Sequence, residues 1–126
     1  MKNLKIYIVT FKRPKILNKT LDILFNKTDF ASVKNSEVNI INNHSDFSLN
    51  KEFVDKVNVI HNNTRSDNDT GNLARNWNEA LIDGFKDLNN PDAKIVVTMQ
   101  NDIVLHRNWV KNLLQMHKKY TFVTGQ

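Results

Sequence analysis

Asp102 is the side chain whose type and position most clearly suggest chemistry. It comes directly after Gln100 and Asn101, so three polar residues follow the apolar run of residues 95–99. Mg²⁺ and Mn²⁺ prefer oxygen ligands and commonly bind one or two carboxylates together with substrate phosphates. Asp102 could supply such a ligand. It could equally be a turn or capping residue ahead of the next helix, and its spacing alone leaves both interpretations open.

Two of the four arginines, Arg13 and Arg75, also stand where a ligand could meet them. Arginine binds phosphate oxygens in a bidentate manner, although a surface ion pair is the commoner role of a single arginine. The formal net charge is +5, and the charged residues are scattered along the chain rather than clustered. This balance suits a solvated basic surface or, as the second interpretation, an anionic ligand.

Short apolar runs alternate along the chain with segments of helical period, and this alternation predicts the elements that position those residues. The predicted strands are residues 4–10, 37–41, 57–61, 94–99 and 121–124. The predicted helices are residues 14–27, 72–88 and 109–120, with a short helix near 49–54.

Repeated alternation of strands and helices predicts an α/β fold, with a mostly parallel sheet and helices on both faces. In open sheets of this kind, ligands bind beyond the carboxyl ends of the strands. The polar segments that follow the predicted strands are residues 10–13, 42–46, 62–72 and 100–102. We expect these segments to converge on one cleft.

The two tryptophans are expected to be structural rather than platforms on which a ligand stacks. Trp77 lies at helical spacing with Leu73 and Leu81, and Trp109 lies so with Leu113. Apolar residues that recur three and four positions apart form one face of a helix, and that face usually packs on the core. Replacement of either tryptophan by Ala is therefore expected to cost about 3–5 kcal/mol of stability.

The residues that the chain lacks exclude several classes of protein. With only Gly71, Gly84 and Gly125, neither a G-x-G-x-x-G loop nor a Walker-type phosphate loop can be written. The absence of cysteine excludes disulfides, thiolate zinc sites and cysteine nucleophiles. The four histidines lack metal-ligand spacing, and no G-x-S-x-G elbow of a serine hydrolase is present.

Length and composition are those of one ordinary globular domain, with 126 residues of which 40% are hydrophobic and 25% charged. The apolar runs are far shorter than the roughly 20 residues of a membrane span, and the N-terminus has no signal-peptide pattern. We therefore expect no transmembrane segment and a cytoplasmic location. Because the basic residues are neither clustered nor interleaved with aromatic ones, nucleic acid is not an expected partner.

Four segments, in order along the chain, resemble nucleotide-sugar glycosyltransferases of the GT-A fold, family-2-like. Residues 9–14 (VTFKRP) resemble the end of the first strand, and 39–46 (NIINNHSD) resemble the second strand with its Asp-Asn-x-Ser-x-Asp turn. Residues 71–76 (GNLARN) resemble the start of the long helix, and 97–105 (VTMQNDIVL) resemble the Asp-x-Asp segment. Composition and the N-terminal segment also resemble the glycosyltransferases with which large algal viruses decorate capsid protein, which implies the host cytoplasm.

The resemblance implies how the nucleoside would be held. Phe11 would pack on the base, with Thr10 and Arg13 near the base, ribose or phosphate. Asn42 stands where the family has a base-reading Asp. That carboxylate helps to select uracil. Its replacement by Asn implies that the base of the donor need not be uracil.

The resemblance also implies how the diphosphate would be held. Arg75 would line the nucleotide cleft, and Gln100 and Asn101 would also bind the nucleotide. Asp102 would bind Mn²⁺ or Mg²⁺ bridged to the diphosphate. Gln100 replaces the first Asp of the family's Asp-x-Asp segment. This departure implies weaker metal binding or a loss of activity.

The expected function is a metal-dependent glycosyltransferase, of hexosyltransferase type, that uses a nucleoside-diphosphate sugar donor and a glycan or glycoprotein acceptor. Residues 1–126 would form a single donor-binding domain that lacks most of the family's acceptor-binding half. The chain would then be a fragment, or a compact member that borrows its acceptor site from a partner. A non-catalytic nucleotide-sugar binding module is the alternative, and release of free nucleoside diphosphate distinguishes the two.

Overall fold

A computed structural model of the chain describes residues 1–62 and 73–118. Its strands are β1 (Lys2–Thr10), β2 (Ser36–Asn42), β3 (Asn58–His61) and β4 (Ala93–Gln100). Its α-helices are α1 (Pro14–Asn26), α2 (Leu73–Phe85) and α3 (Trp109–His117), with short 3₁₀ turns at Asp29–Ser32 and Lys51–Phe53. The predicted strand at residues 121–124 lies outside the described residues.

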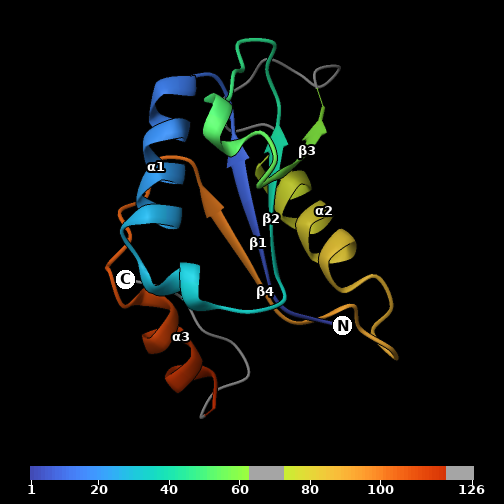
Figure 1. Cartoon of the computed structure of the whole chain (residues 1–126). Coiled ribbons are helices and arrows are strands. Elements are labelled where there is room, and N and C mark those ends of the chain that lie inside the picture. Colours follow the sequence, from blue (N-terminus) through green and yellow to red (C-terminus); the bar gives the residue numbers. More distant parts are fainter. Residues whose placement is uncertain (63–72, 119–126) are drawn as a thin grey trace.

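The four described strands form one parallel sheet in the order β3-β2-β1-β4. A parallel connection must return to the start of the next strand, and helices provide these crossovers. Figure 1 shows α1 and α2 on opposite sides of this sheet. The predicted α/β fold, with a parallel sheet and helices on both faces, is therefore confirmed.

Alternation along β1 divides its side chains between the two faces. Leu4, Ile6 and Ile8 pack into the larger core with residues of α1, α3 and the 3₁₀ turns. Tyr7 and Val9 point to the other face, where they meet Ala80 of α2. Both faces of the strand are buried, as its nearly continuous apolar sequence requires.

Helix α2 approaches the sheet closely at Gly84. A Cβ atom at this position would lie 2.7 Å from Cγ2 of Val96 and 3.2 Å from Cε1 of Tyr7. The residues that face the sheet are therefore the small or polar Asn76, Ala80 and Gly84, all of them buried.

The prediction that the apolar stripe of this helix is buried is wrong in part. Trp77 and Leu81 are 42% and 44% exposed, and Leu88, which follows the end of α2, is 84% exposed. The physical reason is the rotation of α2, which turns its narrow face toward the sheet and its wide side chains to one side. The other tryptophan, Trp109, packs against the larger core as predicted and donates its indole N–H to Thr28 Oγ1 at 3.2 Å.

A polar network lies at the amino half of the sheet, on the face that carries α2. Lys5, only 2% exposed, donates to Asp92 Oδ2 at 2.6 Å and lies 3.9 Å from Glu37. The Tyr7 hydroxyl donates to the carboxylate of Asp83, which anchors α2 to β1. These buried polar groups are paired, as their burial demands.

Among the described residues, no helix is long and apolar enough to cross a membrane.

Candidate site at the carboxyl edge of the sheet

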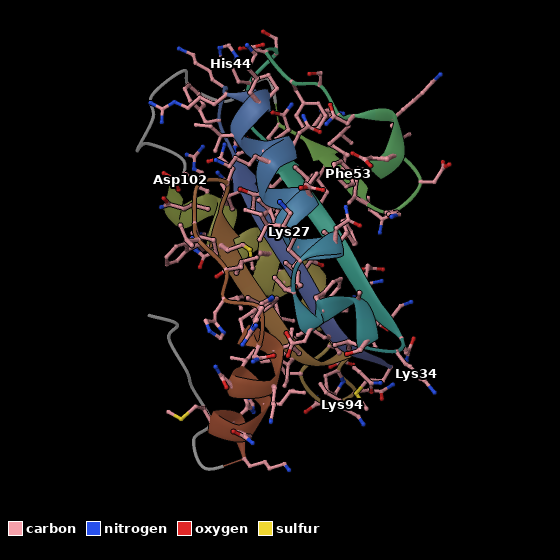
Figure 2. The ribbon with its side chains drawn as sticks, turned by 60° about the vertical axis from the view of Figure 1, so that its left-hand side comes forward. Lys27, Lys34, His44, Phe53, Lys94 and Asp102 are labelled. Carbon is pink, nitrogen blue, oxygen red and sulfur yellow. The ribbon has the colours of Figure 1, made fainter. Side chains whose placement is uncertain are left out.

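All four described strands end at the same edge, in Thr10, Asn42, His61 and Gln100. The register places Thr10 beside Asn42 and Asn42 beside His61, while Gln100 pairs with the preceding residue of β1. Figure 2 shows His44 and Asp102 toward this end of the molecule and Lys34 and Lys94 toward the other. Three of the four polar segments predicted to converge, residues 10–13, 42–46 and 100–102, thus follow strands that end at this edge, and residues 63–72 of the fourth lie outside the described residues.

Thr10 and Asn101 form the best-defined contact of the site. The Asn101 side-chain amide donates to Thr10 Oγ1 at 3.0 Å, and the Asn101 carbonyl accepts from Thr20 Oγ1 at 2.6 Å. Thr10 is 2% exposed, and its hydroxyl also donates to the Lys12 carbonyl at 3.3 Å. These bonds join the ends of β1 and β4 to helix α1.

Asn43 lies beside them, buried and only partly satisfied. Its backbone N–H and its side-chain amide donate to the Thr10 carbonyl at 3.1 and 3.4 Å. Its Oδ1 atom is buried, and no described residue donates to it. An unsatisfied buried acceptor costs about 1–3 kcal/mol, and a buried water is the usual partner of such an atom.

Asn42 is fully buried and holds the turn that follows β2. Its amide nitrogen donates to the His44 carbonyl at 2.8 Å and lies 3.1 Å from His61 Nδ1. Its Oδ1 accepts from the His44 backbone N–H at 3.2 Å. These contacts give Asn42 a structural role in the turn, and its contact with a base stays a prediction.

The β1–α1 loop presents one aromatic ring and two cations. The half-buried Phe11 ring meets His44 edge-on, with centroids 5.1 Å apart, and Lys12 Nζ lies 5.2 Å from the Phe11 centroid. Lys12 and Arg13 are exposed and both adopt left-handed backbone angles, with φ of 59°. Each such residue costs about 1–2 kcal/mol, so the surrounding structure holds this loop in a strained conformation.

The remaining predicted residues lie at the surface of this end. Gln100 is exposed and, by the alternation of β4, belongs to the α2 face, opposite the face on which Asn101 reaches Thr10. Asp102 is exposed in the turn after β4 and Arg75 is exposed in the first turn of α2. Neither side chain is paired with a described residue. The structure thus separates Gln100 from Asn101, while the sequence had placed them together.

The side chains at this edge could hold a hard divalent cation only if substrate phosphates and waters supplied the remaining coordination positions. Among the described residues, no group of three His, Asp or Glu side chains is placed so that it could hold a metal ion. Asp102 supplies one unpaired carboxylate, and Mg²⁺ or Mn²⁺ can bind through one carboxylate plus substrate phosphates and waters. Two hollows in the described part lie elsewhere: one beside α3 and β4, lined by Leu4 and Leu114 among others, and one beside α1.

Sequence reasoning gave no individual role to Thr20, to Asn43 or to the two histidines that contact Asn42, His44 and His61. Thr20 had a readable signal, because it lies between Leu17 and Leu24 on the apolar face of α1 and yet carries a hydroxyl. Asn43 belongs to the predicted polar segment 42–46, but its burial follows from the way β2 ends against β1 and has no signal in the sequence. Residues 71 and 72 of the predicted helix start, and most of the segment 62–72, lie outside the described residues.

Comparison with known proteins does not place the chain in a family, because no protein-family model and no curated protein matches its sequence.

Proposed function

We propose that this domain binds a nucleoside-diphosphate sugar together with Mn²⁺ or Mg²⁺ at the carboxyl edge of its sheet. It then transfers the sugar to a hydroxyl group of a glycan or glycoprotein acceptor. The proposal rests above all on the hydrogen bond from Asn101 to Thr10. This bond joins two of the four segments, 9–14 and 97–105, that resemble GT-A glycosyltransferases.

The nucleoside would lie against the β1–α1 loop. Phe11 offers a half-buried ring held edge-on by His44, and stacking of a base on an aromatic ring contributes about 1–3 kcal/mol. An aromatic face of this kind is a surface on which a base can stack.

The diphosphate would lie beside the exposed cations and Asp102. Lys12 and Arg13 follow Phe11 directly, and Arg75 stands in the first turn of α2. Cations of this kind pair with phosphate oxygens. The divalent ion, held by Asp102 and the diphosphate, would neutralise the charge that develops on the leaving group.

A non-catalytic nucleotide-sugar binding module is the second candidate, and one observation favours it. Asp102 is a single exposed carboxylate, and Gln100, which stands in place of a second one, belongs to the α2 face. A module of this kind would bind donor and metal without releasing nucleoside diphosphate.

Calorimetric titration of the chain with UDP, GDP, CDP and ADP, with and without Mn²⁺, tests binding directly. We expect one diphosphate to bind in a metal-dependent manner, and Asn101→Ala to weaken that binding because it releases the segment before Asp102. Asn112→Ala is the matched control, since Asn112 is an exposed carboxamide on α3.

Turnover then separates the two candidates. The chain is incubated with the nucleotide sugar that corresponds to the diphosphate found to bind, and free nucleoside diphosphate is then assayed. A transferase releases nucleoside diphosphate, whereas a binding module does not. If none of the four diphosphates binds, with or without Mn²⁺, both candidates are wrong.

A further inference from the structure

Thr20 places a hydroxyl on the apolar face of helix α1. Its side chain is 4% exposed, and the same face carries the fully buried Leu17, Leu21 and Leu24. A hydroxyl in such surroundings needs a hydrogen-bond partner, because burial without one is costly. Threonine in a helix commonly donates to the carbonyl four residues earlier, but Thr20 donates to the backbone carbonyl of Asn101 at 2.6 Å. Since a hydroxyl has one proton, this bond commits Thr20 to the turn after β4.

The carbonyl that Thr20 holds belongs to the peptide group that leads into Asp102. A peptide group is planar, so the carbonyl oxygen of Asn101 lies in one rigid plane with the nitrogen and Cα atoms of Asp102. The side chain of Asn101 is held separately, because its amide donates to Thr10 Oγ1 at 3.0 Å. Asn101 is therefore fixed through its backbone and through its side chain. The direction in which Asp102 leaves the strand follows from these two contacts.

A second anchor holds the same segment at its far end. The Asp29 carboxylate accepts from the backbone N–H groups of Val110 and Lys111, at 3.0 and 2.8 Å, and so caps the first turn of α3. Residues 102–108, between the two anchors, contain no helix or strand. Figure 1 shows this connection from β4 to α3 passing beside α1. Asp102 is next to the first anchor and several residues away from the second.

We propose that Thr20 is the positioning residue for Asp102, the carboxylate that would bind the divalent ion. This role rests on the proposed function, and it is indirect, because Thr20 is buried in α1 and reaches Asp102 only through Asn101. A single carboxylate can share Mn²⁺ with a diphosphate only if it points toward the phosphates. Groups that hold a metal ligand in place commonly contribute about 10–100-fold to metal affinity.

Thr20→Val removes the hydroxyl and keeps the shape of the side chain. A second methyl group suits the apolar face of α1, so the helix should stay packed. The Asn101 carbonyl then lacks its donor, and it can turn toward water because Asn101 is only half-buried. The peptide plane would carry Asp102 with it. Thr20→Ser keeps the hydroxyl and should preserve the position of Asp102.

NMR relaxation of the ligand-free chain tests this role without any nucleotide. We expect the order parameter of the Asp102 backbone amide to be about 0.85 in the parent chain and in Thr20→Ser, and to fall below about 0.6 in Thr20→Val. Equal order parameters in the parent chain and in Thr20→Val would overturn the inference. Circular dichroism checks that each variant is folded, and Thr20→Ala replaces Thr20→Val if the valine variant is not.

Calorimetric titration measures the consequence for metal binding. Mn²⁺ is titrated into the chain in the presence of whichever of UDP, GDP, CDP and ADP binds. Thr20→Val should raise the dissociation constant for Mn²⁺ by at least about tenfold, whereas Thr20→Ser should bind as the parent chain does. Asp29→Ala is the matched control, because it releases the far anchor of the same segment. It should lower the melting temperature and leave the binding of Mn²⁺ unchanged.

These outcomes separate the role of Thr20 from the proposed function. If none of the four diphosphates binds with Mn²⁺, the proposed function is wrong, and the order parameter of Asp102 alone decides whether Thr20 holds this residue. If the parent chain binds and Thr20→Val binds Mn²⁺ equally well, Thr20 does not position Asp102, while the proposed function stands. The same conclusion follows if Thr20→Ser fails to restore binding, or if Asp29→Ala weakens it as much as Thr20→Val does.

Discussion

Asp102 is the residue on which metal binding in the proposed function depends. It is exposed in the turn after β4, so its replacement should not disturb the core. We expect Asp102→Ala to weaken Mn²⁺-dependent binding of the nucleoside diphosphate by at least about tenfold, or ~1.4 kcal/mol. Calorimetric titration measures this loss, and the melting temperature should stay that of the parent chain.

The control for Asp102 must be a carboxylate that is exposed and remote. Asp55 meets both conditions, because it precedes the amino end of β3. Asp92 does not, since it is the partner of buried Lys5, whose hydrogen bond lowers the pKa of Asp92. If Asp102→Ala binds metal and nucleotide as well as Asp55→Ala does, Asp102 is a turn residue only.

Tyr7 should make the stability of the protein fall at high pH. Burial, followed by its hydrogen bond to Asp83, raises the pKa of the Tyr7 hydroxyl well above its ordinary value of 10. Above about pH 10 the unfolded chain loses this proton while the folded chain keeps it. The contribution of Tyr7 to the free energy of unfolding should therefore be constant below about pH 10 and decrease above it.

Urea unfolding between pH 8 and pH 11, on the parent and on Tyr7→Phe, measures this dependence. The variant should lose the Tyr7 part of the alkaline decrease. It should also be less stable at pH 8 by about 1–3 kcal/mol, because Asp83 loses a hydrogen bond. Identical alkaline slopes in the two proteins would contradict the assignment.

Among the elements, α2 depends on a close approach to the sheet. Gly84→Ala would normally favour a helix by about 1 kcal/mol. Here the new Cβ would lie 2.7 Å from Cγ2 of Val96 in β4. The β-branched side chain of Val96 has few alternative rotamers and cannot easily move away. Overpacking of this kind costs about 1–3 kcal/mol, so we expect a net loss of stability.

Thermal unfolding of Gly84→Ala beside Asn78→Ala checks this prediction. Asn78 is exposed on the same helix, and alanine there should be neutral or slightly stabilising. A Gly84→Ala variant that is more stable than the parent would show that α2 does not lie this close to β4.

For the whole molecule, ligand binding should appear as added stability. A ligand that binds only the folded state contributes about 2.7 kcal/mol at a concentration 100 times its dissociation constant. With Mn²⁺ present, we expect a nucleoside diphosphate to raise the melting temperature more than the matching monophosphate, because the proposed ion bridges two phosphates. Equal shifts, or no shift with either ligand, would count against the glycosyltransferase proposal.

The sequence by itself determined the α/β class and the approximate bounds of the elements. Apolar runs without alternation, such as residues 95–99, predict strands buried on both faces, because only a covered parallel sheet hides every side chain. The polar residues that end these runs were also correctly placed at one edge. This follows because parallel strands all point their carboxyl ends the same way.

Only the tertiary structure decided how neighbouring side chains divide among surfaces. Trp77 and Leu81 have the spacing of a buried stripe, yet they are exposed because Gly84 brings another face of α2 to the sheet. Gln100 and Asn101 are adjacent in sequence but belong to opposite faces of β4. Helix rotation and strand pairing are set by contacts between distant segments, and a local pattern carries no information about them.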